Sequence, residues 1–180
     1  RAELRAAVFN SRVTFSLAQA QRLVSHAESL EPAVQSLRLG IIHTYTSELL
    51  DPWLAMAAAL QGLELHTYHA PYGLALKEAQ SNSGLVRHEP DITLLLLQRE
   101  DLHPDLAKPL AGFSSAHRQE LSKEVLERLY GMVSRFRAQK VGQIVLTLLP
   151  SIHSPGLGIY DAQSEFSENA WWASLKVEIG

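Results

Sequence analysis

One run of six residues constrains the fold of this chain more than any other feature. Residues Ile92 to Leu97 read Ile-Thr-Leu-Leu-Leu-Leu and are therefore almost wholly apolar. A run of this kind is typical of a strand in a parallel sheet, because helices cover both faces of such a sheet and every side chain meets apolar neighbours. The run therefore predicts an α/β fold.

Strand and helix patterns alternate through most of the chain, which supports this prediction. Such alternation implies right-handed crossovers and a parallel sheet between two helical layers. We expect a three-layer α/β fold of the flavodoxin-like type with strand order 2-1-3-4, in which a fifth strand is missing or lies beyond Gly180. The predicted strands cover residues 37–44, 63–68, 92–97 and 141–149, and the predicted helices cover 48–61, 74–80 and 114–136.

The first 36 residues carry a helical pattern and no strand signal. A helix is expected over residues 2–31, with a capping box formed by Ser16 and Gln19 and with Pro32 as its stop. We therefore divide the chain into an N-terminal helical arm, residues 1–36, and an α/β domain, residues 37–180. Because the chain starts without Met and stops after a segment that looks structured, we expect it to be part of a longer multidomain protein.

Composition excludes several classes of function. The 180 residues are 46% apolar and carry 16 basic against 19 acidic side chains, a net charge of −3, so we expect no nucleic-acid partner. The chain has no cysteine, which excludes disulfides and thiolate metal sites. Its apolar run at residues 54–60 is too short to span a membrane. We expect a cytoplasmic protein without a cofactor.

The carboxyl ends of the strands are the expected ligand site. In an open parallel sheet, ligands bind where the connections diverge, here between the first and third strands. Pro71 and Gly73 shape a turn that could bring Tyr72 to this edge. The predicted cleft residues are His43, Thr44, Tyr45, Tyr72, Gly73, Gln98 and Arg99.

The polar residues in these loops are arranged as in ester hydrolases of the SGNH superfamily. That resemblance implies a Ser nucleophile after the first strand, a Gly-x-Asn-Asp block after the third and an Asp-x-x-His pair near the C-terminus, of which this chain has only the histidine. The residues at these positions are Thr46, Ser47, Asp101 and His153. Gln98 and Glu100 replace the Gly and Asn of the middle block, and a Glu carboxylate cannot donate to an oxyanion. Ser47 also fits the N-cap of the predicted helix 48–61.

A second resemblance extends from residue 37 to about residue 163. In order and spacing, its motifs are similar to the N-terminal, SGNH-like domain of FkbH-like proteins. The motifs are Leu39 to Thr46, Leu65 to Gly73, Ser83 to Leu85, Glu89 to Ile92, Leu102 to Pro104, Leu149-Pro150 and Pro155 to Gly158.

The FkbH-like resemblance implies a place in natural-product biosynthesis. In that family a haloacid-dehalogenase-type domain follows the SGNH-like domain and moves a glyceryl group from a glycolytic phosphate ester to an acyl carrier protein for polyketide and related pathways. This chain lacks the Asp-x-Asp-x-Thr motif of that second domain. The resemblance therefore predicts a binding or docking module, with an acyl carrier protein or the adjacent dehalogenase-type domain as its partner.

Two other hypotheses remain open. The chain could be a divergent esterase or acyltransferase that uses Ser47 or Thr46 with His153 and Asp101. It could also be a scaffold or oligomerisation domain, which the helical arm and the pair Trp171 and Trp172 favour.

The eight histidines also raise the question of a metal site. His66 and His69 lie three apart, so on a continuous strand they face opposite sides of the sheet. Because such a pair cannot chelate one ion, we expect no metal.

Overall fold

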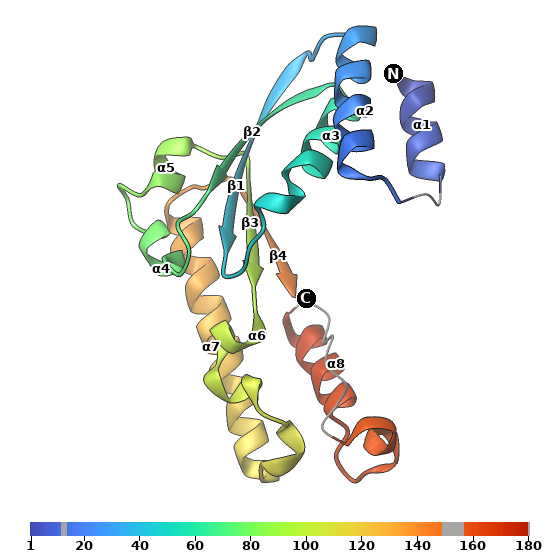
Figure 1. Cartoon of the computed structure of the whole chain (residues 1–180). Helices are drawn as coiled ribbons and strands as arrows, with labels where there is room; N and C mark the ends of the chain where they lie inside the picture. Colours follow the sequence, from blue (N-terminus) through green and yellow to red (C-terminus); the bar gives the residue numbers. More distant parts are fainter. Residues whose placement is uncertain (12–13, 149–156, 180) are drawn as a thin grey trace.

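The computed structural model of the chain describes residues 1–11, 14–148 and 157–179. Four strands form one parallel sheet in the order β2-β1-β3-β4, which confirms the predicted fold class and strand order (Figure 1). The strands are β1 (Gln35–His43), β2 (Leu63–His69), β3 (Ile92–Leu97) and β4 (Gln143–Leu148). The helices are α1 (Ala2–Asn10), α2 (Leu17–Leu30), α3 (Asp51–Gln61), α4 (Ala75–Glu78), α5 (Gly84–His88), α6 (Arg99–Leu102), α7 (Ser115–Ala138) and α8 (Glu168–Ile179), with 3-10 turns η1 (Glu48–Leu50), η2 (Pro104–Ala107), η3 (Leu110–Gly112) and η4 (Gly158–Gln163).

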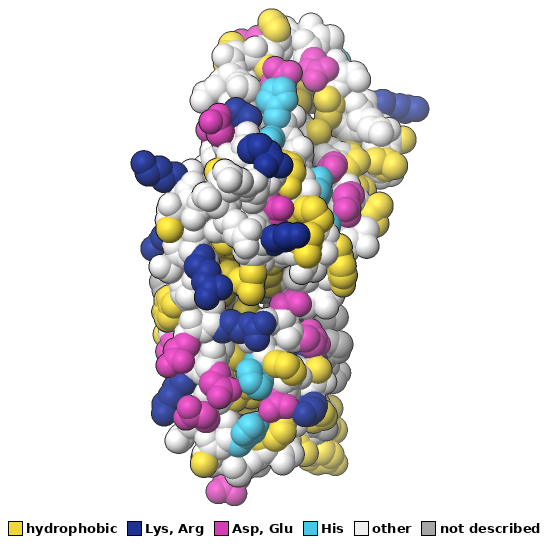
Figure 2. Space-filling view, turned by 90° about the vertical axis from the view of Figure 1, so that its left-hand side faces the viewer, with side chains coloured by type: hydrophobic (Ala, Val, Ile, Leu, Met, Phe, Trp, Pro, Cys, Tyr) yellow, Lys and Arg dark blue, Asp and Glu magenta, His cyan; other side chains and the backbone are white. Residues whose placement is uncertain are grey.

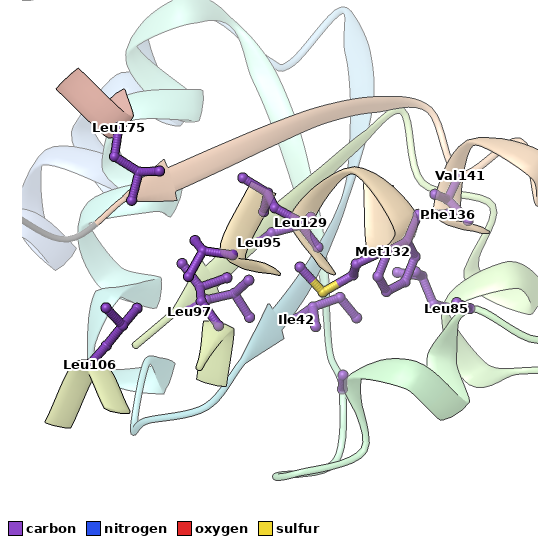
Figure 3. Close-up of a cluster of buried hydrophobic side chains, with 14 of the residues drawn as sticks. Ile42, Leu85, Leu95, Leu97, Leu106, Leu129, Met132, Phe136, Val141 and Leu175 are labelled. Atoms are coloured by element: carbon purple, nitrogen blue, oxygen red, sulfur yellow. The ribbon is translucent and has the colours of Figure 1, made fainter. Parts of the chain in front are cut away.

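Alternating side chains of the sheet build an apolar core on each face. Ile42 of β1 and Leu95 of β3 belong to the larger cluster, together with Leu129 and Phe136 of α7 (Figure 3). Ile41, the neighbour of Ile42, belongs to a second cluster on the opposite face. Because adjacent strand residues point to opposite faces, the two clusters require helices on both sides of the sheet.

Helix α7 forms one wall of the larger core, as its apolar stripe predicts. The helix begins after Ser114, whose hydroxyl accepts a hydrogen bond from the backbone N–H of His117 at 3.2 Å. This cap satisfies one of the free N–H groups at the helix start. Leu121 and Val125 of the same stripe are almost fully buried.

The N-terminal region forms two helices rather than the single helix predicted over residues 2–31. The capping box is confirmed, since Gln19 N–H donates to Ser16 Oγ and Ser16 N–H donates to Gln19 Oε1. That cap starts a new helix, α2, instead of lying inside a longer one. Ala20 and Ala27 of α2 are fully buried in a cluster with Met56 of α3. The apolar stripe of the arm is therefore covered by α3 (Figure 1).

The bounds of the elements differ in detail from the expected ones. Strand β1 begins at Gln35, two residues before the predicted start, and α5 was not predicted. Trp171 and Trp172 contact each other edge to face in α8, at 5.0 Å between ring centroids, and pack against the larger core. Along the described part of the chain, no helix combines the length and the apolar character needed to cross a membrane.

Candidate functional site

Two depressions lie at the carboxyl edge of the sheet, one on each side of β1. The first, which we call the α7 cleft, has a volume of about 740 Å³ and lies at the switch point between β1 and β3. The second, the histidine pocket, has a volume of about 620 Å³ and lies between the ends of β1 and β2. The α7 cleft is lined by Thr44, Gly73 to Lys77, Leu97, Glu100 to Leu102, Glu127, Arg128, Gly131, Met132 and Arg135; the histidine pocket is lined by His43, Thr46, Glu48, His69, Ala70, Pro71 and Tyr72.

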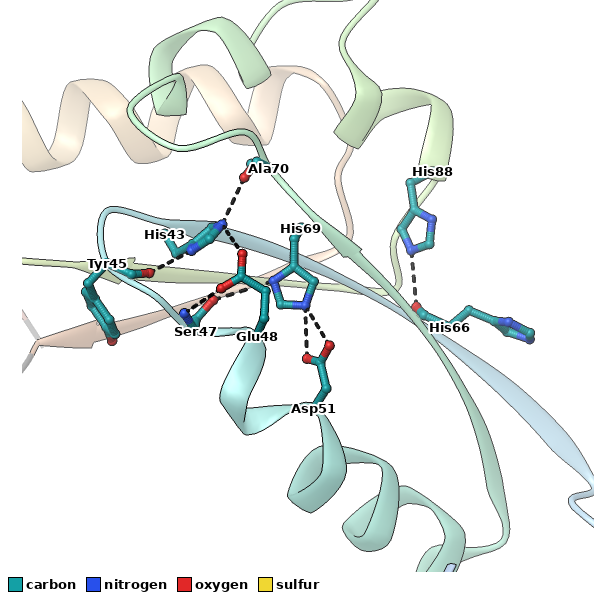
Figure 4. A network of polar contacts seen from close by, with 9 residues as sticks. All are labelled: His43, Tyr45, Ser47, Glu48, Asp51, His66, His69, Ala70 and His88. Atoms are coloured by element: carbon teal, nitrogen blue, oxygen red, sulfur yellow. Dashed lines mark hydrogen bonds and ion pairs between the residues drawn. The ribbon is translucent and has the colours of Figure 1, made fainter. Parts of the chain in front are cut away.

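His43 is the last residue of β1 and forms the floor of the histidine pocket. Its side chain is only 4% exposed. Nδ1 lies 2.7 Å from the carbonyl oxygen of Tyr45, and Nε2 lies 2.9 Å from that of Ala70 (Figure 4). A carbonyl oxygen only accepts, so a neutral ring can donate to one of these two groups and not to both.

A hydroxyl, an imidazole and a carboxylate lie in a chain beside His43. Ser47 Oγ lies 3.5 Å from His69 Nδ1, and His69 Nε2 lies 2.9 and 3.1 Å from the two carboxylate oxygens of Asp51 (Figure 4). This is the order of groups in a serine hydrolase, although here the carboxylate is bonded to Nε2 and the hydroxyl faces Nδ1. Ser47 is only 1% exposed and does not line the pocket. The structure therefore places the relay groups together but shields the hydroxyl.

The alternative role of Ser47 as a helix cap is wrong. Residues 48–50 form the 3-10 turn η1, and helix α3 begins only at Asp51. Ser47 has φ −115° and ψ −12°, which is not the extended conformation usual for a capping residue, and its side chain makes no capping hydrogen bond. Its hydroxyl is turned toward His69 instead.

Glu48 is the most accessible carboxylate of the histidine pocket. Its side chain is 54% exposed and lies 3.9 Å from His43 Nε2. The pKa of Glu48 is lowered, chiefly because its own backbone N–H donates to the carboxylate, and further by the nearby His43 and His69. Ser47 N–H also donates to this carboxylate, at 3.0 Å. Glu48 therefore favours its charged form.

The α7 cleft carries cations that the protein itself leaves without partners. Lys77, Arg128 and Arg135 line it, and among the described residues none of these three side chains has a hydrogen-bond or ion-pair partner. Arg128 and Arg135 lie seven residues apart on α7 and so share one face of the helix. Figure 2 shows Lys and Arg side chains around a hollow whose floor is hydrophobic.

The acidic side chains of the same cleft are partly engaged. Glu100 pairs with Arg99, at 3.3 Å between Oε1 and Nε. Asp101 accepts a hydrogen bond from the backbone N–H of Gln98 at 2.9 Å. The lining therefore holds three cations and three carboxylates, and Glu100 is already paired with Arg99.

The structure divides the predicted catalytic and cleft residues between the two depressions, and Ser47 lines neither. Thr46 and Tyr72 line the histidine pocket, whereas Gly73 and Asp101 line the α7 cleft. No contact joins Asp101 to Ser47, because the Asp101 carboxylate caps α6. His153 lies outside the described residues.

The other predicted cleft residues serve mainly to hold the strand ends. Thr44 is buried, and its hydroxyl accepts a hydrogen bond from Gln98 N–H at 3.1 Å, which ties β1 to β3. Tyr45 packs beside the smaller core, and burial raises the pKa of its hydroxyl. Arg99 pairs with Glu100.

Sequence reasoning missed Glu48, Asp51 and the role of His69. A signal existed for His69, because it ends the second predicted strand and so lies at the ligand-binding edge. Asp51 carried the weaker signal of an acidic residue in a helical first turn, where carboxylates are common. The sequence carried no signal for Arg128 and Arg135, because only the packing of α7 shows which face of this long helix borders the cleft.

Comparison with known proteins supports the architecture. No family model matches the chain, and no curated protein matches it. Among solved structures, the chain is similar to the N-terminal part of the protein BF1531 from Bacteroides fragilis, whose crystal structure contains a phosphatase domain complexed with Mg. The TM-score is 0.64 at 16% sequence identity, and the match covers 92% of this chain and 41% of that one. At this identity the likeness shows a shared fold, and the chain spans less than half of its neighbour's length.

Proposed function

We propose that this chain is the SGNH-like N-terminal domain of an FkbH-like protein, and that its α7 cleft binds the phosphopantetheine arm of an acyl carrier protein during glyceryl transfer. The observation that carries this proposal is the set of three unpartnered cations, Lys77, Arg128 and Arg135, around the α7 cleft. The similarity to the N-terminal part of a protein with a phosphatase domain supports the family.

The shape and charge of the cleft suit this ligand. Its volume of about 740 Å³ falls within the range of roughly 300–1,000 Å³ that is usual for small-molecule sites. Leu74, Leu97 and Met132 offer apolar contacts for the pantetheine chain, while the guanidinium groups can bind its phosphate through charge-assisted hydrogen bonds. The transfer chemistry itself belongs, on this proposal, to a phosphatase-type domain of the same protein.

Titration with free 4′-phosphopantetheine tests the proposal. We expect saturable binding by calorimetry, and at least tenfold weaker binding of pantetheine, which lacks the phosphate. Gly131→Phe should abolish binding, because a side chain there projects into the cleft, where an added Cβ meets no atom within 4 Å. Gly112→Phe is the matched control, since Gly112 also has open space around it but does not line the cleft.

Two results would contradict this proposal. Equal affinity for pantetheine and phosphopantetheine would show that the protein does not recognise the phosphate. Unchanged binding by a folded Gly131→Phe variant would show that the ligand does not bind in the α7 cleft.

An ester hydrolase is the second candidate, favoured by the Ser47–His69–Asp51 chain. Because Ser47 is only 1% exposed, we expect no cleavage of p-nitrophenyl acetate above the rate of the Ser47→Ala variant. Cleavage that disappears on this substitution would establish the hydrolase and displace the binding role. The features that favoured a scaffold, the helical arm and the tryptophan pair, are both packed within the chain.

A further inference from the structure

We propose that the histidine pocket binds a divalent transition-metal ion, with Zn²⁺ as the preferred ion, through His43, Glu48 and His69. Each of these residues offers one ligand atom, and the three atoms lie within 4.8 Å of one another. They come from the ends of two adjacent strands and from the turn that follows β1 (Figure 4). The site is separate from the α7 cleft and does not depend on the function proposed above.

The ligand set suits zinc. Two imidazoles and one carboxylate are the protein ligands of several catalytic zinc sites, which leave a fourth position for water or substrate. Zn–N and Zn–O bonds of about 2.0–2.2 Å place neighbouring ligand atoms about 3.3 Å apart, so the three atoms must close around the ion. Glu48 can supply this movement because its side chain is 54% exposed and the pocket that it lines is open to solvent.

Asp51 orients His69 for this role. It binds Nε2 through both carboxylate oxygens, so that Nε2 carries the proton and the lone pair of Nδ1 faces the interior of the cluster. A carboxylate behind a ligating imidazole is the usual outer-shell partner of metal-bound histidine. Ser47 Oγ, at 3.5 Å from Nδ1, is too distant for a strong competing hydrogen bond.

His43 can offer Nε2 as the second nitrogen ligand. If Nδ1 donates its proton to the carbonyl of Tyr45 at 2.7 Å, Nε2 presents a lone pair to the carbonyl of Ala70 at 2.9 Å. To bind an ion, Nε2 must give up its contact with the Ala70 carbonyl and direct this lone pair to the ion. The Glu48 carboxylate, 3.9 Å from Nε2, would be the second ligand of that ion.

Metal titration of the intact chain tests this site. After treatment with EDTA and desalting, Zn²⁺ is titrated in competition with a chromogenic chelator, and Co²⁺ is titrated by its visible absorption. We expect one ion per chain, with Co²⁺ bands typical of nitrogen ligation. His69→Gln should abolish binding, Glu48→Gln should weaken it at least tenfold, and Asp51→Asn should weaken it roughly 10–100-fold because the outer-shell carboxylate is lost.

His66→Gln is the matched control, because His66 lies on the same strand but outside the cluster. It should bind like the wild type. Glu48 and Asp51 are partly exposed, so these two variants decide the question if His69→Gln does not fold. The proposal is overturned if the wild type binds no stoichiometric ion, or if Glu48→Gln and Asp51→Asn bind as tightly as His66→Gln.

Discussion

The histidine pocket and the α7 cleft lie side by side at one edge of the sheet but differ in how their polar groups are satisfied. In the histidine pocket, His43 contacts two backbone carbonyls and His69 contacts Asp51. In the α7 cleft, Arg128 and Arg135 have no partner among the described residues. Groups that partner one another hold the structure in place, whereas unpartnered exposed cations remain available to an incoming ligand.

The alternation of β1 accounts for this division. His43 is the last residue of β1 and Thr44 follows it directly, and successive residues of an extended chain point to opposite sides. His43 therefore lines one depression and Thr44 the other. The loop after β2 repeats the division, since Tyr72 lines the histidine pocket and Gly73 lines the α7 cleft. The end of β1 thus contributes side chains to both depressions.

The largest expected effect is a loss of ligand binding in the α7 cleft, with no change in the histidine pocket. The double variant Arg128→Glu/Arg135→Glu should weaken 4′-phosphopantetheine binding by at least about 100-fold, because each lost charge-assisted hydrogen bond contributes about 1.5–3 kcal/mol. Calorimetry measures the loss, and zinc affinity should not change. Arg137→Glu is the control, because this arginine lies on α7 outside the cleft. If phosphopantetheine binding survives the double variant, the cations of the cleft are not its ligands.

A second substitution measures how far the histidine pocket supports the fold. His43→Leu removes the ring that faces the carbonyls of Tyr45 and Ala70. We expect the free energy of unfolding to fall by about 1–3 kcal/mol, because a neutral ring donates to one of the two carbonyls and a buried acceptor without a partner costs about that much. Urea denaturation in the presence of EDTA gives the value.

The matched change in the other depression is Arg135→Leu. It should alter stability by less than about 0.5 kcal/mol, because Arg135 is exposed and unpartnered. If His43→Leu and Arg135→Leu lower the free energy of unfolding by similar amounts, the two depressions do not differ in how far they support the fold.

The smallest expected effects are changes in stability on substitution of two glycines that line the α7 cleft. Gly131→Ala should stabilise the chain by about 0.5–1 kcal/mol, because glycine is unfavourable inside a helix and an added Cβ meets no atom within 4 Å. Gly73→Ala should destabilise it by about 1 kcal/mol, because Gly73 has φ +72°. Thermal and urea unfolding measure both. A destabilised Gly131→Ala variant would show that glycine is required there for a reason other than the open cleft.

Much of the fold could be predicted from local patterns. The apolar run of β3, the stripe of α7 and the Ser16–Gln19 capping box each depend on residues close in sequence, and all three are present. Where prediction differed, as in the single helix expected over residues 2–31, the helical periodicity continued across a segment at which the chain starts a new helix at Ser16.

The sequence alone determined the α/β class, the strand order and the edge of the sheet at which polar residues gather, because these follow from periodicity and from the rules of parallel connections. Only the tertiary structure decided which polar residues meet. Ser47 contacts His69, from a strand 22 positions away, and Asp51 completes the contact. Such partners are set by strand order and by the direction of each side chain at the strand end. A pattern read along one strand does not contain that information.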